Sequence, residues 1–296
     1  MNLKNNLILL IPFLLPHLLI AQYPNASQSV YLKAHSITTI EKYEVYKDSM
    51  GTKEVLVSKI TLNSSGYMTK QEAFGMDGEP KGMYEYIYED DTLMIKTSMT
   101  PQNHPTMKAS HAITTYDASK KKVGSSSWYD DKLQLILTYN YSKNGQLKSI
   151  DHIWYNCYED GKKDGKGKMK YNYNTEGYLS ERSFIRKING KVRKEFYTFH
   201  YDSLSKTYET YVSFGNDPGK MLYNKTFHDD HKRLVIEDQY SRTGSSWHMT
   251  TASISIKKGE ARRKTYLYDE RGLIESETLS VNGENKLVTL FRYVKE

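Results

Sequence analysis

The segment Phe227-His228-Asp229-Asp230-His231 is the densest group of possible metal ligands in the chain. Imidazole and carboxylate groups bind zinc and similar ions. Asp is also common in turns for backbone reasons, and neighbouring residues of a strand point to opposite faces. A metal site would need His200 or His248 to be brought in by the fold. Because the segment falls on a repeated turn, we expect it to shape that turn, and no metal or other cofactor is predicted.

The acidic and Gly-rich segment 159–167 has some features of a calcium loop. Lys162, Lys163 and Lys166 stand among the positions where oxygen ligands are needed, and no Glu follows at the required offset. We therefore expect a long, solvated hairpin tip. Cys157 is the single cysteine and has no identifiable catalytic partner, so structural filling is the expected role.

No catalytic motif is present in the sequence. There is no Gly-x-Ser-x-Gly elbow, no phosphate-binding loop and no His-Glu-x-x-His pair. No catalytic residue is predicted, and we expect a protein that is not an enzyme. The alternative is a glycan-active hydrolase, because the two carboxylates of such an enzyme are brought together by the fold and leave no spacing signature.

Three tryptophans are the candidate binding residues: Trp128, Trp154 and Trp247. Trp128 and Trp247 each follow a short run of small polar residues. An exposed indole beside polar groups is a common platform for sugar rings or protein partners. The alternative is that the three rings pack against neighbouring hairpins.

These side chains are positioned by a repeated segment that organises the chain. Each copy opens with an aromatic residue, then Asn, Asp or Ser, two polar residues, Gly, one residue and an aliphatic residue. The clean copies are Tyr141 to Leu147 with Gly145, Tyr173 to Leu179 with Gly177, Tyr268-Asp269 to Ile274 with Gly272, and, with Leu in place of the aromatic residue, Leu62 to Met68 with Gly66.

Weaker copies fill the space between the clean ones. Counting all eight, the first positions are 62, 88, 116, 141, 173, 201, 227 and 268, and six of the seven gaps lie between 25 and 32 residues. The copies at 88, 116 and 201 lose the Gly, and the copy at 227 needs a one-residue insertion. Such regular spacing indicates a tandem repeat of about 27 residues.

One unit predicts one hairpin step. Before Tyr173, apolar residues alternate with polar ones, which is the period of a half-buried strand. Gly177 supplies a positive φ in the turn, and Leu179 to Ile188 returns as a second strand. Asn189-Gly190 is a strong signal for the next hairpin.

The fold class is therefore all-β. Tandem antiparallel hairpins predict a long twisted or coiled meander sheet of roughly sixteen strands, with partial closure into a barrel left open. The expected organisation is a signal peptide at 1–21, an N-terminal cap at 22–58 and the repeat domain at 59–296. The part from Tyr31 to Lys47 fits either a capping strand or a short helix.

The first 21 residues indicate export. Lys4 precedes an apolar run from Leu7 to Ile20 that ends at Ala21, which is a secretory signal peptide. The run is too short to span a bilayer, and no transmembrane segment is predicted. A single cysteine in a secreted chain fits a bacterial periplasm or cell exterior.

Composition supports a thin β architecture. The chain has 26 Tyr against 8 Phe, and Tyr suits half-exposed sheet faces because its ring packs while its hydroxyl reaches water. The net charge of +7 is spread among 35 acidic residues. We do not expect a nucleic-acid partner, since export takes the chain away from most nucleic acid.

The Tyr-Asp-x-x-Gly-x-Leu pattern resembles the YD repeat of the RHS (rearrangement hotspot) family of bacterial secreted proteins. Tyr268-Asp269 with Gly272 and Ile274 is the nearest match. The resemblance covers about residues 60 to 296 and implies hairpins that coil into a shell or sheet. The longer spacing and the missing glycines are more similar to small secreted proteins of the Bacteroidetes type, for which the family implies no defined activity.

Together these features predict a secreted, non-catalytic β-repeat protein that binds or scaffolds at the cell envelope. Its expected ligand is a glycan or an envelope protein. The expected location is the periplasm or the exterior, with association to the cell surface as one form of the latter.

Overall fold

The computed structural model describes residues 26–48, 51–90, 93–103, 108–155, 163–188, 191–215, 219–240, 245–248, 253–256 and 260–295. The expected signal peptide, its cleavage point at Ala21, and Cys157 lie outside these residues. Asn189-Gly190 also lies outside them.

One helix and twenty strands make up the described chain. They are α2 (Ala26–Ala34), β1 (Ile37–Asp48), β2 (Gly51–Leu62), β3 (Met68–Phe74), β4 (Pro80–Glu89), β5 (Leu93–Pro101), β6 (Ser110–Tyr116), β7 (Lys122–Tyr129), β8 (Lys132–Tyr141), β9 (Leu147–Tyr155), β10 (Lys163–Tyr173), β11 (Leu179–Ile188), β12 (Lys191–Asp202), β13 (Thr207–Phe214), β14 (Met221–His228), β15 (Leu234–Tyr240), β16 (Ser245–His248), β17 (Ser253–Ile256), β18 (Ala261–Tyr268), β19 (Ile274–Val281) and β20 (Glu284–Lys295).

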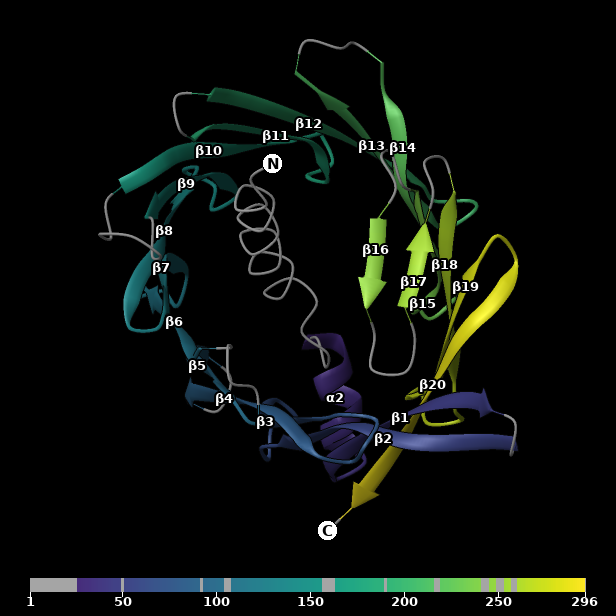
Figure 1. The fold of residues 1–296 in the computed structure, drawn as a ribbon. Helices are drawn as coiled ribbons and strands as arrows, with labels where there is room; N and C mark the ends of the chain where they lie inside the picture. The colour runs from purple at the N-terminus through teal and green to yellow at the C-terminus, as the bar shows by residue number, and fades with distance from the viewer. Residues whose placement is uncertain are drawn as a thin grey trace, which may run out of the picture.

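Eighteen of the strands form one closed barrel (Figure 1). Each strand pairs antiparallel with the next along the chain, and β15 pairs with β18. β1 closes the ring, because Ile40 lies opposite Ile60 of β2 on one side and opposite Tyr293 of β20 on the other. β16 and β17 pair only with each other. The prediction of an all-β protein of antiparallel hairpins is confirmed.

The predicted twisted or coiled meander is corrected in one respect, because the sheet closes completely on itself. An open sheet of this size would leave the backbone groups of two edge strands without partners, and closure satisfies both rows. The information for closure lies in the pairing of β1 with β20, which are separated by almost the whole chain. A pattern that repeats locally contains nothing about that contact.

The resemblance to YD-repeat and RHS proteins is overturned by the same finding. That resemblance predicted hairpins coiled into a shell or an open sheet, whereas the chain forms a closed 18-stranded barrel. The interpretation as a YD-repeat or RHS-like protein is therefore corrected. A seven-residue motif describes one turn and its flanking strands, and hairpins of this kind can be assembled into more than one architecture.

The motif residues have a local structural role in the turns. In the copy at Tyr268, the Asp269 Oδ1 accepts hydrogen bonds from the backbone N–H groups of Arg271 and Leu273, each at 2.9 Å. Gly272 then takes a φ of +78°. Asn174 accepts from two backbone N–H groups in the same way, with Gly177 at φ +86°.

Two copies without Gly keep the same backbone conformation at that position. Lys120 and Lys232 occupy the Gly position with φ of 60° and 61°. The turn of the latter runs from Asp229, so that His228 stands at the first position of the copy. The insertion expected after Phe227 is therefore not needed, since the copy starts one residue later.

In four copies the tyrosine that opens the copy ties one hairpin to the one before it, and Tyr293 of the last strand does the same. The phenol of each donates a hydrogen bond to a backbone carbonyl oxygen 19 to 34 residues earlier in the chain. The pairs are Tyr116 to Met94 at 2.9 Å, Tyr141 to Lys122 at 2.8 Å, Tyr173 to Leu147 at 3.0 Å, Tyr268 to Leu234 at 2.7 Å and Tyr293 to Ile274 at 2.7 Å. This contact explains why Tyr holds the position.

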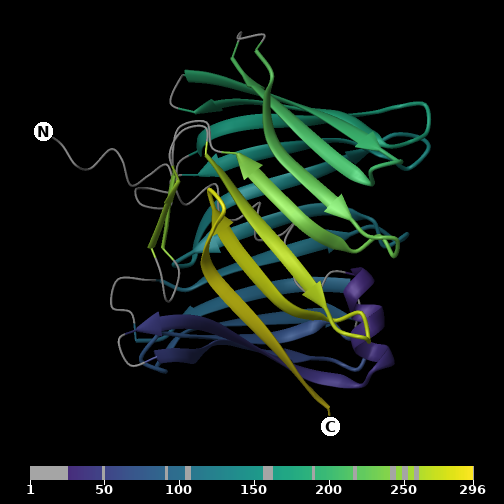
Figure 2. The ribbon, with the colours of Figure 1, turned by 90° about the vertical axis from the view of Figure 1, so that its right-hand side faces the viewer.

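The segment expected as an N-terminal cap, 22–58, contributes both a helix and barrel strands. After α2 the chain enters β1 and then β2, so that Tyr31 to Lys47 contains part of the helix and part of a strand. Figure 2 shows α2 at one end of the barrel, the end where the C-terminus also lies. Leu32 of the helix is fully buried in the larger apolar cluster, with Ile40, Ile60 and Leu273.

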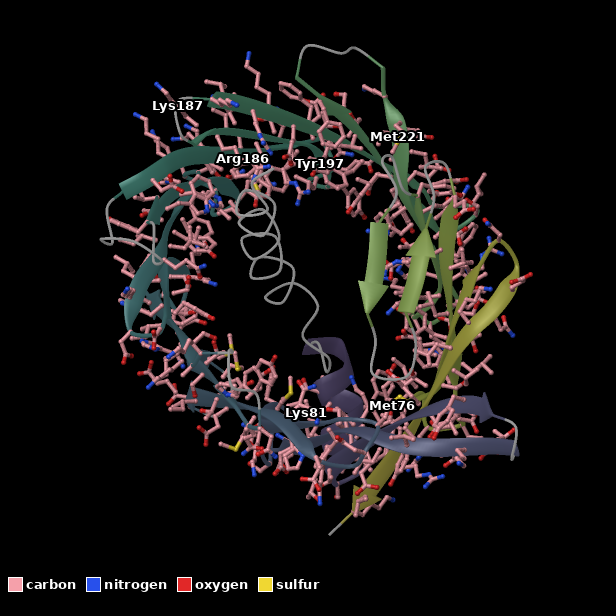
Figure 3. All side chains as sticks on the ribbon, viewed as in Figure 1. Met76, Lys81, Arg186, Lys187, Tyr197 and Met221 are labelled. Carbon is pink, nitrogen blue, oxygen red and sulfur yellow. The ribbon has the colours of Figure 1, made fainter. Side chains whose placement is uncertain are left out.

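The wall of the barrel has two different faces. Side chains of a strand alternate between faces, and residues that lie opposite each other on neighbouring strands share one. Figure 3 shows Arg186 and Tyr197 on the inner side of the ring and Lys187 on the outer side. The second apolar cluster, Leu135, Leu137 and Ile150, lies on the same inner face as Arg186.

Candidate functional site

Seven side chains from three strands form a cluster on the inner face of the wall, and two of them, Arg186 and Tyr197, are labelled in Figure 3. Cross-strand pairing links the strands in register, because Gly167 of β10 lies opposite His152 of β9 and also opposite Arg186 of β11. We call the set the inner-wall cluster: His152, Trp154, Arg182, Phe184, Arg186, Glu195 and Tyr197.

A buried ion pair lies at the centre of the inner-wall cluster. The Arg186 Nη2 is 3.1 Å from the Glu195 Oε1, and the two side chains are only 9% and 10% exposed. The phenol of Tyr197 donates a hydrogen bond to the other carboxylate oxygen, also at 3.1 Å. Both carboxylate oxygens are therefore engaged, and Glu195 is held as a structural anion. Burial is the main cause, and the neighbouring Glu195 the second, of a raised pKa of Tyr197, so the phenol stays protonated.

Arg182 lies beside this pair on the same strand as Arg186. Its guanidinium carbon is 4.2 Å from the ring centroid of Tyr197, to which Arg182 lies directly opposite, and 5.9 Å from that of Phe199. A guanidinium stacked on an aromatic face still presents its N–H groups at its edge. Arg182 can thus donate hydrogen bonds to a ligand while the rings hold it in place.

An aromatic group completes the cluster. The His152 ring is stacked on Trp154 at 5.3 Å and lies 5.0 Å from Phe184, and Trp154 and Phe184 are 6.0 Å apart. His152 is only 6% exposed, and burial lowers its pKa to about 4. Its Nε2 is buried and has no hydrogen-bond partner among the described residues. The neutral His152 ring thus has one nitrogen that makes no hydrogen bond with the described residues.

Gly167 in β10 makes room for this packing. A Cβ on Gly167 would lie 2.8 Å from the Cη2 of Trp154 and 3.0 Å from the carbonyl oxygen of Ile185. The indole thus lies over β10 where a side chain would otherwise stand. The sequence predicted a hairpin tip through Gly167, but β10 already begins at Lys163. The part of the segment from Lys163 onward is wall.

The two tryptophans whose side chains are described lie on opposite faces of the wall. Trp128 lies on β7, on the opposite face from the buried Ser125 and Ser127, and its ring stacks on His111 at 4.8 Å. Trp154 is on the inner face. Trp247 belongs to β16, and its side chain is outside the described ones. Of the two described tryptophan side chains, that of Trp154 belongs to the inner-wall cluster.

The aspartates of the 227–231 segment are used locally. The Asp229 carboxylate accepts from the backbone of His231 and Arg233, and the Arg233 guanidinium pairs with it at 2.7 Å. Asp230 pairs with Lys206. In the part of the chain that the structure describes, no group of three or more His, Cys, Asp or Glu side chains could hold a metal ion.

Sequence reasoning missed six of the seven members of the cluster. Their signal is that charged and aromatic residues share one strand face. Arg182, Phe184 and Arg186 alternate on β11, and Glu195, Tyr197 and Phe199 alternate on β12. Charged residues on a face that also contains apolar rings mark a wall of mixed character. Only the closed barrel shows which of the two faces points inward.

No helix among the described residues is long and apolar enough to cross a membrane.

Comparisons with known protein families and with curated proteins give no match. Among solved structures, the chain is similar to a porin-like protein from Bacteroides uniformis at 12% identity and a TM-score of 0.40, covering 87% of this chain and 96% of that one. A porin-like protein from Bacteroides vulgatus gives 9% identity and a TM-score of 0.33, with 87% and 98% covered. The structure titled TcdB2-TccC3-TEV gives 12% identity and a TM-score of 0.27, covering 83% of this chain and 14% of that one. Such low scores and identities establish no shared function.

Proposed function

We propose that the chain is a non-catalytic binding protein of the bacterial envelope, which works in an aqueous compartment and takes its ligand on the inner wall of the barrel. The observation that carries the proposal is the inner-wall cluster. It places stacked aromatic rings, an oriented guanidinium and a buried imidazole nitrogen side by side on one concave wall. Binding sites combine apolar surface with a few placed polar groups in this way. The expected signal peptide at 1–21 supports the envelope location.

The outer face of the wall supports an aqueous surrounding. Lys168 and Asp151 form an ion pair there at 3.1 Å, with the two side chains 48% and 43% exposed. Lys70 and Glu72 form another at 2.9 Å on β3. A wall facing lipid needs an apolar band, and charged side chains at membrane depth are costly. We therefore expect the purified chain to elute as a single species in size-exclusion chromatography without detergent.

The inner wall supports binding more strongly than catalysis. Glu195, the buried carboxylate of the cluster, has both oxygens engaged by Arg186 and Tyr197. A glycoside hydrolase needs one carboxyl group free to donate a proton and a second free to attack the substrate or to activate water. A carboxylate held in a buried ion pair suits neither task.

The test is ligand stabilisation of the purified mature chain by fractions of a bacterial envelope. Polysaccharide, peptide and lipid fractions are added separately, and the thermal unfolding midpoint is followed. A ligand present at one hundred times its Kd raises the midpoint by roughly 5–10 °C. The test variant is Arg182→Met, which removes the guanidinium. The control is Lys187→Met on the outer face of the same strand.

A saturable rise that is lost in Arg182→Met and kept in Lys187→Met supports the proposal. If no fraction raises the midpoint, or if both variants lose the effect equally, the inner wall is not a binding surface. Turnover of a polysaccharide by the wild-type chain would replace the proposal with the hydrolase alternative.

A further inference from the structure

Three tyrosine rings lie exposed beside one another at the end of the barrel that contains the repeated turns. Tyr178, Tyr201 and Tyr208 are 50%, 44% and 41% exposed. Tyr201 stacks on Tyr208 with centroids 4.3 Å apart and planes 28° apart, and Tyr178 lies 6.1 Å from Tyr201. We call these residues the rim tyrosines. Exposed rings in contact with one another form a continuous aromatic surface.

Two of the rim tyrosines, Tyr201 and Tyr208, flank a turn of the repeat that differs from the turns of the clean copies. In the copy at Tyr268 the residue with positive φ is Gly272, three positions after Asp269, but in the copy at Tyr201 it is Lys206, four positions after Asp202. Tyr201 holds the position of the tyrosines that donate to a carbonyl of the preceding hairpin. Its ring instead stacks on Tyr208 and is exposed to solvent, whereas the corresponding tyrosines of other copies hydrogen-bond to the neighbouring hairpin.

The rim tyrosines face the mouth of the barrel. Tyr201 shares a face with Tyr197, which is on the inner side of the ring, because the two are four residues apart on one strand (Figure 3). Tyr208 lies directly opposite Tyr201 on β13 and so shares that face. A folded protein cannot readily approach rings on the inside of a wall. A thin, extended chain can.

Three charged groups near the rings have partners. Lys206 pairs with Asp230, and Asp202 accepts hydrogen bonds from the Ser205 hydroxyl at 2.6 Å and the Leu204 N–H at 2.9 Å. Nucleic acids and acidic lipids are attracted by uncompensated cations. Extended peptides commonly add to an open sheet edge, which a closed barrel does not offer. The surroundings therefore favour an uncharged ligand rich in hydroxyl groups.

We propose that the rim tyrosines bind a neutral, linear glycan, with sugar rings stacked on Tyr201, Tyr208 and Tyr178 at the mouth of the barrel. The aromatic faces take the apolar sides of the sugar rings, and the neighbouring polar groups take hydroxyls. The inference rests on the proposed binding function and adds to it the class of ligand and a second contact surface, apart from the inner-wall cluster.

The experiment measures the Kd of the purified mature chain for neutral linear polysaccharides, namely an α-glucan, a β-glucan and a mannan, by affinity electrophoresis and calorimetry. A sulfated polysaccharide and a proline-rich peptide serve as the anionic and peptide probes. The test variant is Tyr201→Ala with Tyr208→Ala. The control is Leu267→Ala with Ile87→Ala, which removes two exposed apolar side chains from the outer face. Thermal unfolding checks that all variants fold.

We expect at least one neutral polysaccharide to bind, and the test variant to weaken that binding about tenfold or more, while the control binds as the wild type does. Tyr201→Phe with Tyr208→Phe keeps the rings and is expected to retain most of the affinity. Equal affinity in test variant and wild type overturns the proposal, as does binding of the sulfated probe or the peptide alone. If envelope peptides or lipids stabilise the chain but no neutral glycan binds, the glycan inference fails while the binding function stands.

Discussion

Gly66 joins the helix to the barrel at a contact that allows no side chain. Gly66 lies in the first repeated turn, before β3 begins, with a φ of +78°. A Cβ built on it would lie 2.4 Å from the carbonyl oxygen of Ser29 in α2. Gly177 occupies the same position in another copy at φ +86°, where the nearest atom to such a Cβ is the Gln146 side chain at 3.7 Å. The two glycines have the same backbone conformation and differ in what they touch.

Replacing each glycine by Ala separates the two effects. A left-handed conformation costs an L-residue about 1–2 kcal/mol, and both variants incur it. Only Gly66→Ala also forces the Ser29 backbone away, and overpacking of this kind costs typically 1–3 kcal/mol more. We therefore expect a loss of about 1–2 kcal/mol for Gly177→Ala and about 2–5 kcal/mol for Gly66→Ala.

The assay is urea unfolding of the two variants and the wild type, followed by circular dichroism. The midpoint should fall further for Gly66→Ala, and its α2 amide groups should exchange faster with solvent because Leu32 loses its packing. Equal destabilisation of the two variants would refute the reasoning, since it would mean that α2 does not press on the 63–67 turn. A control at Gly78, with φ +79° and no atom within 4 Å of a Cβ, should behave as Gly177 does.

Three further predictions concern the wall. Arg186→Met breaks the buried ion pair and should lower the free energy of unfolding in urea by about 3–5 kcal/mol. Adding Glu195→Leu should restore much of that stability, because it removes the isolated carboxylate. A double variant no more stable than the single one contradicts the prediction. Burial lowers the pKa of His152 from 6.5 to about 4, so between these pH values the unfolded chain binds more protons than the folded chain. The free energy of unfolding should therefore fall by about 3 kcal/mol as the pH is lowered from 6.5 to 4. His152→Asn should flatten that dependence, and an unchanged slope excludes His152 as its source. Tyr268→Phe removes the hydrogen bond to the Leu234 carbonyl and should cost about 1 kcal/mol, whereas Tyr201→Phe, where no such bond forms among the described residues, should be near neutral in the same unfolding assay.

The sequence by itself determined the local structure of this protein. Period-2 alternation and positive-φ glycines such as Gly177 and Gly272 give strand, turn and strand with little help from distant contacts, because hydrogen bonds within five residues fix the turn. The aromatic residue that opens most copies was identified from the sequence as the first position of the repeat. Its partner carbonyl on the previous hairpin was not, since the repeat pattern states spacing but not register.

Closure of the barrel and the inner-wall cluster were decided only by the tertiary structure. Alternation divides each strand into two faces, yet both faces of this wall contain charged and apolar side chains, so the pattern does not tell which is inside. The pairing of Ile40 with Tyr293 settles that question by joining the first strand to the last. Arg182, Glu195 and His152 acquire their partners from the register of the consecutive strands β9 to β12, and closure places these side chains on the inside of the ring.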